Sequence, residues 1–383
     1  MSGAEERADT AATPARGGEP ATLRALWARR LTRRNLARLA AGLCVGAAGG
    51  FAADLAGVPL AWMLGAIFLC MIASFAGAPI DVPVWFRMAF LAVIGLFLGE
   101  SFSFASAEDL ARWPLTLVGA VLYVPVGGYI CFRMFRFLSR MDGGTSLLIS
   151  LPGGLTAIAL FAEEMGTDER RVALYHALRV ALVVMAAPLI AFGWLGLPPP
   201  EGVPGHEGGL IGAWDFALLA GVSIPLVLLL RRMGWPVPYL LGPLVASAAL
   251  RFPGVIEGGM PAWTVELALM VAGASIGTRF HGVPLRFFAQ TAGWTLLGTV
   301  VLMALSFGFA LAAHAVLGVD LFAALLAYAP GGVAEMSLVA IAIDADPAFV
   351  ATHHLARIFA VLLTLPLAAG FIRRLLAEGR DGP

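Results

Sequence analysis

The stretch LPGGLTA at residues 151–157 recurs 178 positions later as APGGVAE at residues 329–335. Both copies lie inside long apolar segments, where Pro-Gly-Gly breaks the helical hydrogen-bond ladder and leaves two half-helices. Each half-helix is too short to cross the roughly 30 Å of hydrocarbon in a bilayer. Backbone that is broken at membrane depth is tolerated only where protein or water satisfies its polar groups. The two breaks therefore predict a duplicated polar centre inside a membrane protein.

The repeat extends well beyond the breaks. Further segments keep nearly the same offset: LAVIGLFLGESF (91–102) aligns with LMVAGASIGTRF (269–280), HALR (176–179) with HLAR (354–357), and GVPLAWMLGAI (57–67) with GWPVPYLLGPL (234–244). Chance does not keep one register over so long a distance. The sequence therefore predicts two tandem copies of one unit.

Composition places the chain in lipid. Of its 383 residues, 60% are hydrophobic and 13% charged, and the mean hydropathy is +0.86. Apolar stretches of about 20 residues, the length of one bilayer crossing, recur from Leu36 to Phe371 and leave no room for a separate soluble domain. The net charge is zero, so a basic face that binds nucleic acid is not expected. The predicted fold is an all-α polytopic membrane protein.

Each unit contains about six apolar segments, and the fifth carries the break. In the first unit they lie near 36–54, 59–77, 84–103, 114–138, 145–165 and 172–195. If the fifth segment enters the membrane and returns, each unit crosses five times, and this odd number inverts the second copy. Six full crossings per unit is the alternative.

The arginines favour the inverted arrangement, because cytoplasmic loops collect basic residues. Five crossings place most arginines in the cytoplasm, together with both termini: the N-terminal cluster, Arg87, Arg133, Arg136, Arg140, Arg170, Arg171, Arg231, Arg232, Arg279, Arg286, Arg373 and Arg374. Only Arg112 and Arg251 then fall in outside loops. Six crossings would put Arg231, Arg232, Arg279 and Arg286 outside.

The predicted organisation follows from these segments. It comprises a disordered tail with a basic juxtamembrane cluster (1–35), unit one (36–195), a connector (196–213), unit two (214–375) and a C-terminal tail (376–383). A retained first helix is favoured over a cleaved signal peptide, given the acidic leader and the later spans. The three cysteines lie in apolar segments without a C-x-x-C pair, so we expect small buried residues rather than disulfides or a metal site.

Inverted repeats with one broken helix each are typical of secondary transporters, whose sites lie where the breaks meet. The free N–H groups of the half-helix after each break suit an anion. Glu335 adds a protonatable group beside the second break. Its repeat mate, meaning the residue at the equivalent position of the other unit, is Ala157. Each unit also has a histidine and an arginine three residues apart, His176 with Arg179 and His354 with Arg357. This spacing puts each pair on one face of a helix, within an otherwise apolar segment. The candidate substrate-binding residues are Pro152, Gly153, Gly154, Thr156, His176, Arg179, Pro330, Gly331, Gly332, Glu335, His354 and Arg357.

Structural alternatives exist for each feature. Pro-Gly-Gly can simply kink a packed helix. The arginines can snorkel to the interface, or can cap carbonyls that the broken segment leaves free. Asp168 and Asp346 precede the helices that carry the His and Arg, and we expect them to cap those helices. The G-x-x-x-G pairs Gly95/Gly99 and Gly273/Gly277 indicate close helix packing, within the unit or between protomers.

The motifs GVPLAWMLGA, PVPYLLGPLVAS, ASIGTRF and APGGVAEMSLVA, in a duplicated membrane unit, resemble the AbrB-type membrane family of Gram-negative bacteria, from about Leu36 to Arg374. The resemblance implies an inner-membrane protein, labelled in this family as a regulator of gene expression or an ammonia monooxygenase. Neither label carries a mapped active site. The small soluble transition-state DNA-binding proteins that share the name show no likeness to this chain.

Two functions are expected from these features. The first is a permease for a small, anionic solute, with its site at the two breaks and no cofactor. The second is a membrane regulator that acts indirectly on gene expression. An enzyme is the least favoured, because the six histidines offer no clustered ligand set for copper or iron. The expected partners are the lipid bilayer and a small solute or ion, with homo-oligomerisation left open.

Overall fold

The computed structural model describes residues 32–102, 107–139, 141–153, 155–194, 209–343 and 345–380. Regular structure in these ranges is helical, apart from an isolated parallel bridge between Leu210 and Gly259. The first half contains α2 (Arg33–Leu55), α3 (Ala61–Phe75), α4 (Val84–Ser101), α5 (Ala107–Leu138), α6 (Gly143–Ser150), α7 (Leu155–Glu164), α8 (Glu169–Pro188) and a π-helix (Leu189–Trp194). The second half contains α9 (Ala213–Arg232), α10 (Pro238–Arg251), α11 (Ala262–Gly277), a 3₁₀ turn (Thr278–Phe280), α12 (Leu285–Leu317), α13 (Leu321–Tyr328), α14 (Val333–Ala342) and α15 (Pro347–Arg380). Most of the predicted tails and connector lies outside the described residues.

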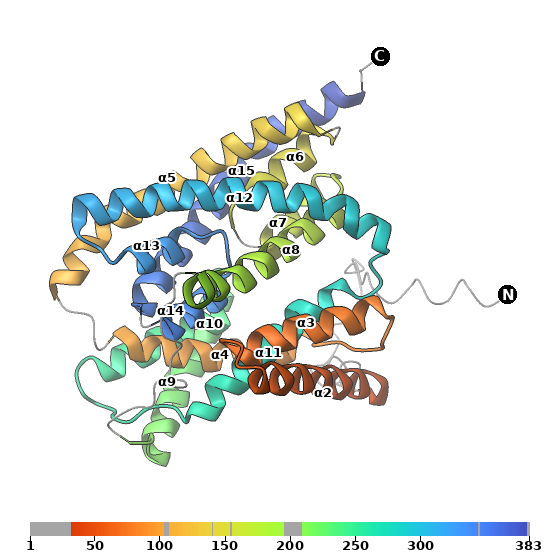
Figure 1. Cartoon of the computed structure of the whole chain (residues 1–383). Helices are drawn as coiled ribbons and strands as arrows, with labels where there is room; N and C mark the ends of the chain where they lie inside the picture. Colours follow the sequence, from red (N-terminus) through yellow and green to blue (C-terminus); the bar gives the residue numbers. More distant parts are fainter. Residues whose placement is uncertain are drawn as a thin grey trace, which may run out of the picture.

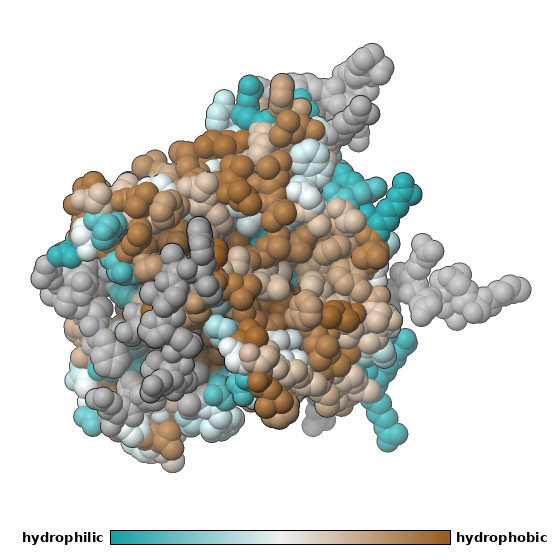
Figure 2. Space-filling view, viewed as in Figure 1, coloured by the Kyte–Doolittle hydropathy of each residue, from teal (hydrophilic) through white to brown (hydrophobic). Residues whose placement is uncertain are grey.

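Seven of the described helices, α2, α4, α5, α8, α9, α12 and α15, are long and apolar enough to cross a membrane. Figure 2 shows apolar side chains over most of one face of the molecule, with hydrophilic residues gathered toward its margins. The chain is therefore a multi-pass membrane protein. Cys70 and Cys131 are buried as expected, whereas Cys44 is exposed, because it lies on α2, most of whose surface faces outward.

The order and spacing of helices are the same in the two halves. Helices α4 to α8 begin 178 positions before α11 to α15, and α3 begins 177 before α10. Two described residues other than glycine have positive φ, Leu60 at 51° and Val237 at 43°. They too are 177 positions apart, and they precede α3 and α10. Because positive φ is strained for a bulky residue such as leucine or valine, its recurrence at matched positions is an unusual backbone feature that the two halves have in common.

The halves are joined by glycine contacts between α4 and α10. A Cβ built on Gly95 would lie 2.4 Å from the carbonyl oxygen of Leu240, and one on Gly99 would lie 2.3 Å from that of Leu244. No side chain fits in that space. The sequence predicted packing within a unit or between protomers, but the contact joins one half of the chain to the other.

A reciprocal contact joins α11 to α3. Cβ atoms on Gly273 and Gly277 would lie 2.4 Å and 2.7 Å from the carbonyl oxygens of Met63 and Ile67. Met63 and Ile67 stand 177 positions before Leu240 and Leu244, so the second contact is the first with the halves exchanged. Four helices, α3, α4, α10 and α11, therefore form one reciprocal packing unit.

Helices α5 and α12 lie beside each other and run in opposite directions (Figure 1). Near the middle of α5, the ring of Tyr123 lies 5.7 Å from that of Phe309. Nearer its C-terminal end, the ring of Phe135 lies 6.4 Å from that of Trp294, close to the start of α12. These equivalent helices are antiparallel.

We expect Gly95→Ala and Gly273→Ala each to destabilise the protein by about 1 to 3 kcal/mol, because an added methyl group meets a backbone carbonyl that cannot move freely. Thermal unfolding of the detergent-solubilised protein should then occur several degrees lower. Gly221→Ala and Gly293→Ala are matched controls, since no atom lies within 4 Å of a Cβ at either position. Wild-type unfolding of both test variants would contradict the close contact.

Candidate functional site

Both breaks interrupt the helices where the sequence places them. Helix α6 ends at Ser150 and α13 at Tyr328, and the next residues, Leu151 and Ala329, are extended, with ψ of 125° and 140°. Each precedes a buried proline, which disfavours helical backbone in the residue before it. Of the other predicted site residues here, Gly153, Gly331 and Gly332 are half-buried, Gly154 lies outside the described residues, and Thr156 lies in α7 with its side chain outside the description.

The His and Arg of the first half hold the end of α6. From α8, the ring Nε2 of His176 lies 3.1 Å from the carbonyl oxygen of Leu148, to which it donates. The Arg179 guanidinium donates to the carbonyl of Leu151 at 2.9 Å. Both side chains are buried. These carbonyls are among the four that a helix leaves unsatisfied at its C-terminus.

The second half repeats this arrangement. From α15, His354 donates to the carbonyl of Leu326 at 2.9 Å. Arg357 donates to the carbonyls of Ala329 and Ala327, and at 3.5 Å to that of Gly331, so its guanidinium spans the break. An arginine only 2% exposed does not snorkel. The geometry fits the interpretation in which each arginine caps carbonyls freed by the break.

These contacts set the direction of α8 relative to α6. The N–H of Asp168, which precedes α8, donates to the Thr145 hydroxyl near the start of α6 at 3.2 Å. Eight and eleven residues later, His176 and Arg179 reach the end of α6. The two helices are therefore parallel, and α7 runs back between them.

The aspartates that precede α8 and α15 cap these helices, as the sequence predicted. The carboxylate of Asp168 accepts from the N–H of Arg171 at 3.0 Å. That of Asp346 accepts from the N–H groups of Ala348 and Phe349 at 2.9 and 3.0 Å. Each therefore fixes the start of a helix that carries a His and an Arg.

The two capping arginines leave the centre of the molecule positively charged. Arg179 and Arg357 repel each other electrostatically, and the Arg357 guanidinium lies 5.7 Å from the centre of the Tyr123 ring. Among the described side chains, no carboxylate forms an ion pair with either. The carbonyl ends of α6 and α13 each supply about half a negative charge at most. The remaining positive charge suits an anion.

Glu335 lies beside the second break, at the start of α14. A Cβ built on Gly332 would lie 2.1 Å from its carboxylate oxygen, so the carboxylate lies directly against the backbone of the break. Glu335 also interacts electrostatically with Arg87 near the start of α4 and with Arg279 after α11. Burial, helped by Arg87 and opposed by Glu335, lowers the pKa of Arg279 to about 10. Arg279 therefore stays charged at neutral pH.

In the sequence analysis, Arg87 and Arg279 served only as evidence for which loops are cytoplasmic, and neither was predicted to be a site residue. The pattern that distinguishes them was available: their repeat mates are Val265 and Ser101, just as the mate of Glu335 is Ala157. Arg87, Arg279 and Glu335 are therefore each charged in one unit and replaced by an uncharged residue in the other. The polar groups near the second break are therefore asymmetric.

Arg251, which was predicted in an outside loop, lies at the end of a helix next to that loop. It ends α10 and is buried. Its guanidinium lies 3.4 Å from the carboxylate of Glu100 on α4, and its Nε donates to the Ser247 hydroxyl at 3.2 Å. Because a carboxylate neutralises it inside the protein, Arg251 carries no information about which loop is cytoplasmic.

A family profile described as the transition state regulatory protein AbrB matches residues 62–373. The chain belongs to the AbrB family. The Bacillus subtilis (strain 168) protein YhjN is 28% identical over 375 residues, covering 88% of this chain and 94% of YhjN. The Escherichia coli (strain K12) protein named "Putative regulator AbrB" is 30% identical over 323 residues, covering 82% of this chain and 90% of that protein.

We expect Arg179→Ala and Arg357→Ala to destabilise this AbrB-family protein by about 1 to 3 kcal/mol for each buried carbonyl left without a partner. Thermal unfolding in detergent measures the loss. Arg373→Ala, an exposed position on α15, is the matched control and should unfold with the wild type. If Arg179→Ala and Arg357→Ala also do so, the breaks are held by other groups.

Proposed function

We propose that this AbrB-family chain is a permease that carries a small anionic solute across the membrane, with its site at the two breaks. The observation that carries this proposal is the pair of buried arginines, Arg179 and Arg357, which have no carboxylate ion-pair partner among the described residues. Burying an unpaired charge is costly. Ionisable residues inside a membrane protein therefore mark a functional site by default.

The same proposal includes an inverted repeat. Helices α5 and α12 are equivalent in position and run antiparallel. If the two units were related by an axis along the membrane normal, equivalent membrane-crossing helices would run parallel. An axis in the membrane plane makes them antiparallel, which is the symmetry of inverted-repeat transporters.

The parallel course of α6 and α8 supports a re-entrant segment in each unit. Because α8 begins beside the start of α6, the segment of α6 and α7 enters the protein and returns to the side from which it came. His354 and Arg357 align α15 with α13 in the same way. Each unit then crosses the membrane five times, with α2 to α5 and α8 in the first unit and α9 to α12 and α15 in the second.

The solute and its coupling ion would meet at the second break. The N-cap of α14 is Gly332, which has no side chain to cap the helix, and the Glu335 carboxylate lies beside it, so the N–H groups of the first turn would receive an anion where Glu335 gives way. Arg87 and Arg279 add positive charge nearby. Glu335 is the group we propose to exchange a proton, because a carboxylate beside an anion site repels the solute when ionised and admits it when protonated.

The name of the Escherichia coli relative and the description of the family both refer to regulation. A permease can produce such an effect without contacting DNA, by changing the concentration of its solute in the cell. Regulation by the chain itself would need a partner to carry the signal. We favour transport because the charged centre needs a ligand.

Cysteine labelling tests the orientation. In a background with Cys44, Cys70 and Cys131 replaced by alanine, we expect Phe137→Cys and Glu164→Cys, which flank the first broken segment, to react with an impermeant thiol reagent from the cytoplasmic side. Val316→Cys, which precedes the second segment, should react from outside. All three positions are exposed. Labelling of Phe137→Cys and Glu164→Cys from opposite sides would show a full crossing.

Flux measurements test transport itself. Proteoliposomes should take up one or more members of a panel of small carboxylates and inorganic anions, and neither a neutral sugar nor lysine.

We expect Arg279→Gln to reduce the rate of anion uptake at least about tenfold, because removing a charge near the solute costs about 1.4 kcal/mol or more. Glu335→Gln should remove the dependence on a pH gradient. Gly293→Ala is the control. If no anion crosses while the folded protein still alters gene expression with a partner, the regulatory function is correct.

A further inference from the structure

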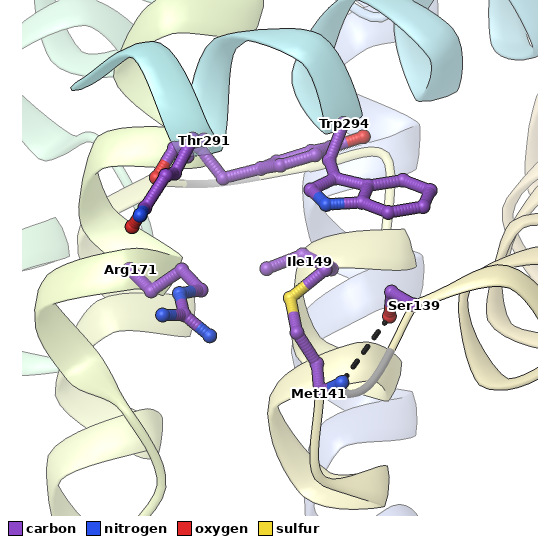
Figure 3. A pocket seen from close by; sticks show the side chains of 8 residues that line it. Ser139, Met141, Ile149, Arg171, Thr291 and Trp294 are labelled. Atoms are coloured by element: carbon purple, nitrogen blue, oxygen red, sulfur yellow. Dashed lines mark hydrogen bonds between the residues drawn. The ribbon is translucent and has the colours of Figure 1, made fainter. Parts of the chain in front are cut away.

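A pocket of about 410 Å³ opens beside the first broken segment. Figure 3 shows Arg171 of α8 on one side, Thr291 and Trp294 of α12 on another, and Met141 and Ile149 opposite them. Its volume lies in the range of small-molecule sites. None of these residues was singled out by the sequence.

The lining combines one cation with polar and apolar groups. Arg171 is about one-third exposed and forms an ion pair with Asp168 at 3.4 Å, and it is the one charged side chain among the residues that line the pocket. Gln290 and Thr291 supply an amide and a hydroxyl, whereas Trp294, Met141 and Ile149 supply apolar surface. Among the pocket's lining residues, no carboxylate balances Arg171. This combination fits a small organic anion, with its charged group at Arg171 and its carbon skeleton against the indole.

The pocket leads toward the first break. Tyr175 forms part of its wall, is 1% exposed, and has a hydroxyl with no hydrogen-bond partner. The next residue along α8 is His176, which holds α6, and Arg179 follows one turn later. Ile149 lies between the Leu148 and Leu151 carbonyls that these two side chains bind. The inner end of the pocket is therefore adjacent to the proposed site.

The pocket lies at an arginine-rich end of the helices that form it. The guanidinium carbons of Arg170 and Arg171 lie 5.2 and 5.7 Å from the centre of the Phe287 ring, at the start of α12. The arginine distribution places this end in the cytoplasm. The pocket is then open to the cytoplasmic side.

The equivalent place beside the second break is filled. The mates of Thr291 and Trp294 are Trp113 and Thr116, so the large and small residues have exchanged positions along the helix. The mate of Arg171 is Phe349, whose ring lies 5.9 Å from that of Trp113. All three of these mates are buried.

His353, the mate of Tyr175, completes this aromatic plug, which consists of Trp113, Thr116, Phe349 and His353. Its ring lies 3.9 Å from that of Phe349, and its Nε2 lies 2.8 Å from the Thr116 hydroxyl. Nδ1–H donates to the Phe349 carbonyl at 2.7 Å. Both ring nitrogens are therefore engaged within the plug.

We infer that the pocket at Arg171 is the cytoplasmic entry site for a small organic anion, and that the aromatic plug closes the equivalent route from the outside. The inference rests on the proposed permease and its inverted repeat, since only an inverted repeat places the pocket and the plug on opposite sides of the membrane. It assigns a ligand class and a binding residue, Arg171, that lie outside the two breaks.

Thiol reaction rates test accessibility and charge without any transport. In the background free of native cysteine, Trp294→Cys and its mate Thr116→Cys are exposed to two impermeant methanethiosulfonates, the anionic sulfonatoethyl and the cationic trimethylammonioethyl reagent. The rate at which each reagent modifies the protein cysteine is divided by its rate with free 2-mercaptoethanol, which corrects for the different intrinsic reactivities of the two reagents. Gel filtration confirms that each variant is folded, and Gln290→Cys serves as a second pocket position if Trp294→Cys is not.

We expect Trp294→Cys to react from the cytoplasmic side, with the anionic reagent favoured about tenfold in normalised rate. Adding Arg171→Gln should bring this preference near one, whereas Arg373→Gln should not change it. Thr116→Cys should be unreactive from either side, and should react from outside once Phe349→Ala removes part of the plug.

Three results would overturn the inference: a pocket cysteine that does not react, a preference for the cationic reagent, or a Thr116→Cys that reacts as fast as Trp294→Cys. The inference and the proposed function can fail separately. Labelling as expected with no flux of any anion would leave an anion-binding site without transport. Flux without reaction at the pocket would place the solute's route elsewhere.

Discussion

The hydrogen bonds from His176, Arg179, His354 and Arg357 to backbone carbonyls are the interactions on which the rest of the structure depends. A helix that stops inside the membrane leaves carbonyls that lipid cannot satisfy, each at a cost of several kcal/mol. Side chains from the next long helix meet this need in both halves. The same contacts fix that helix parallel to the half-helix it holds, and so they determine how the chain returns through the protein.

Satisfying carbonyls with arginine rather than with a neutral donor has an electrostatic consequence. A guanidinium donates several hydrogen bonds, but it brings a full positive charge, and a helix end offsets only about half of it. Two such charges repel each other at the centre. The contrast with Arg251 shows that this is not the only arrangement available, because there Glu100 neutralises a buried arginine directly. The positive charge that is not neutralised is therefore specific to Arg179 and Arg357.

The breaks and the helix caps could be predicted because each depends on residues that are close together in the sequence. Pro152 and the glycines after it follow directly on the end of α6, and Asp168 caps the residues next to it. The partner of Gly95 could not be predicted, because G-x-x-x-G states that a helix packs closely but not against which helix. Two further features could not be predicted from local patterns either, because they depend on how the two halves pack together. These are the burial of Arg251 and the electrostatic interactions of Glu335 with Arg87 and Arg279.

The two halves have matching backbone features but differ in the side chains beside their breaks. The helix starts, the positive φ angles of Leu60 and Val237 and the glycine contacts all correspond. The difference between an open pocket and a filled one comes from a few substitutions, above all the exchanged order of Trp and Thr on α5 and α12. A change of access from one side to the other would therefore require helices to shift against one another and side chains to repack, while the capped breaks keep their hydrogen bonds. In the permease that we propose, alternating access to one site would use such a fixed centre between adjustable ends.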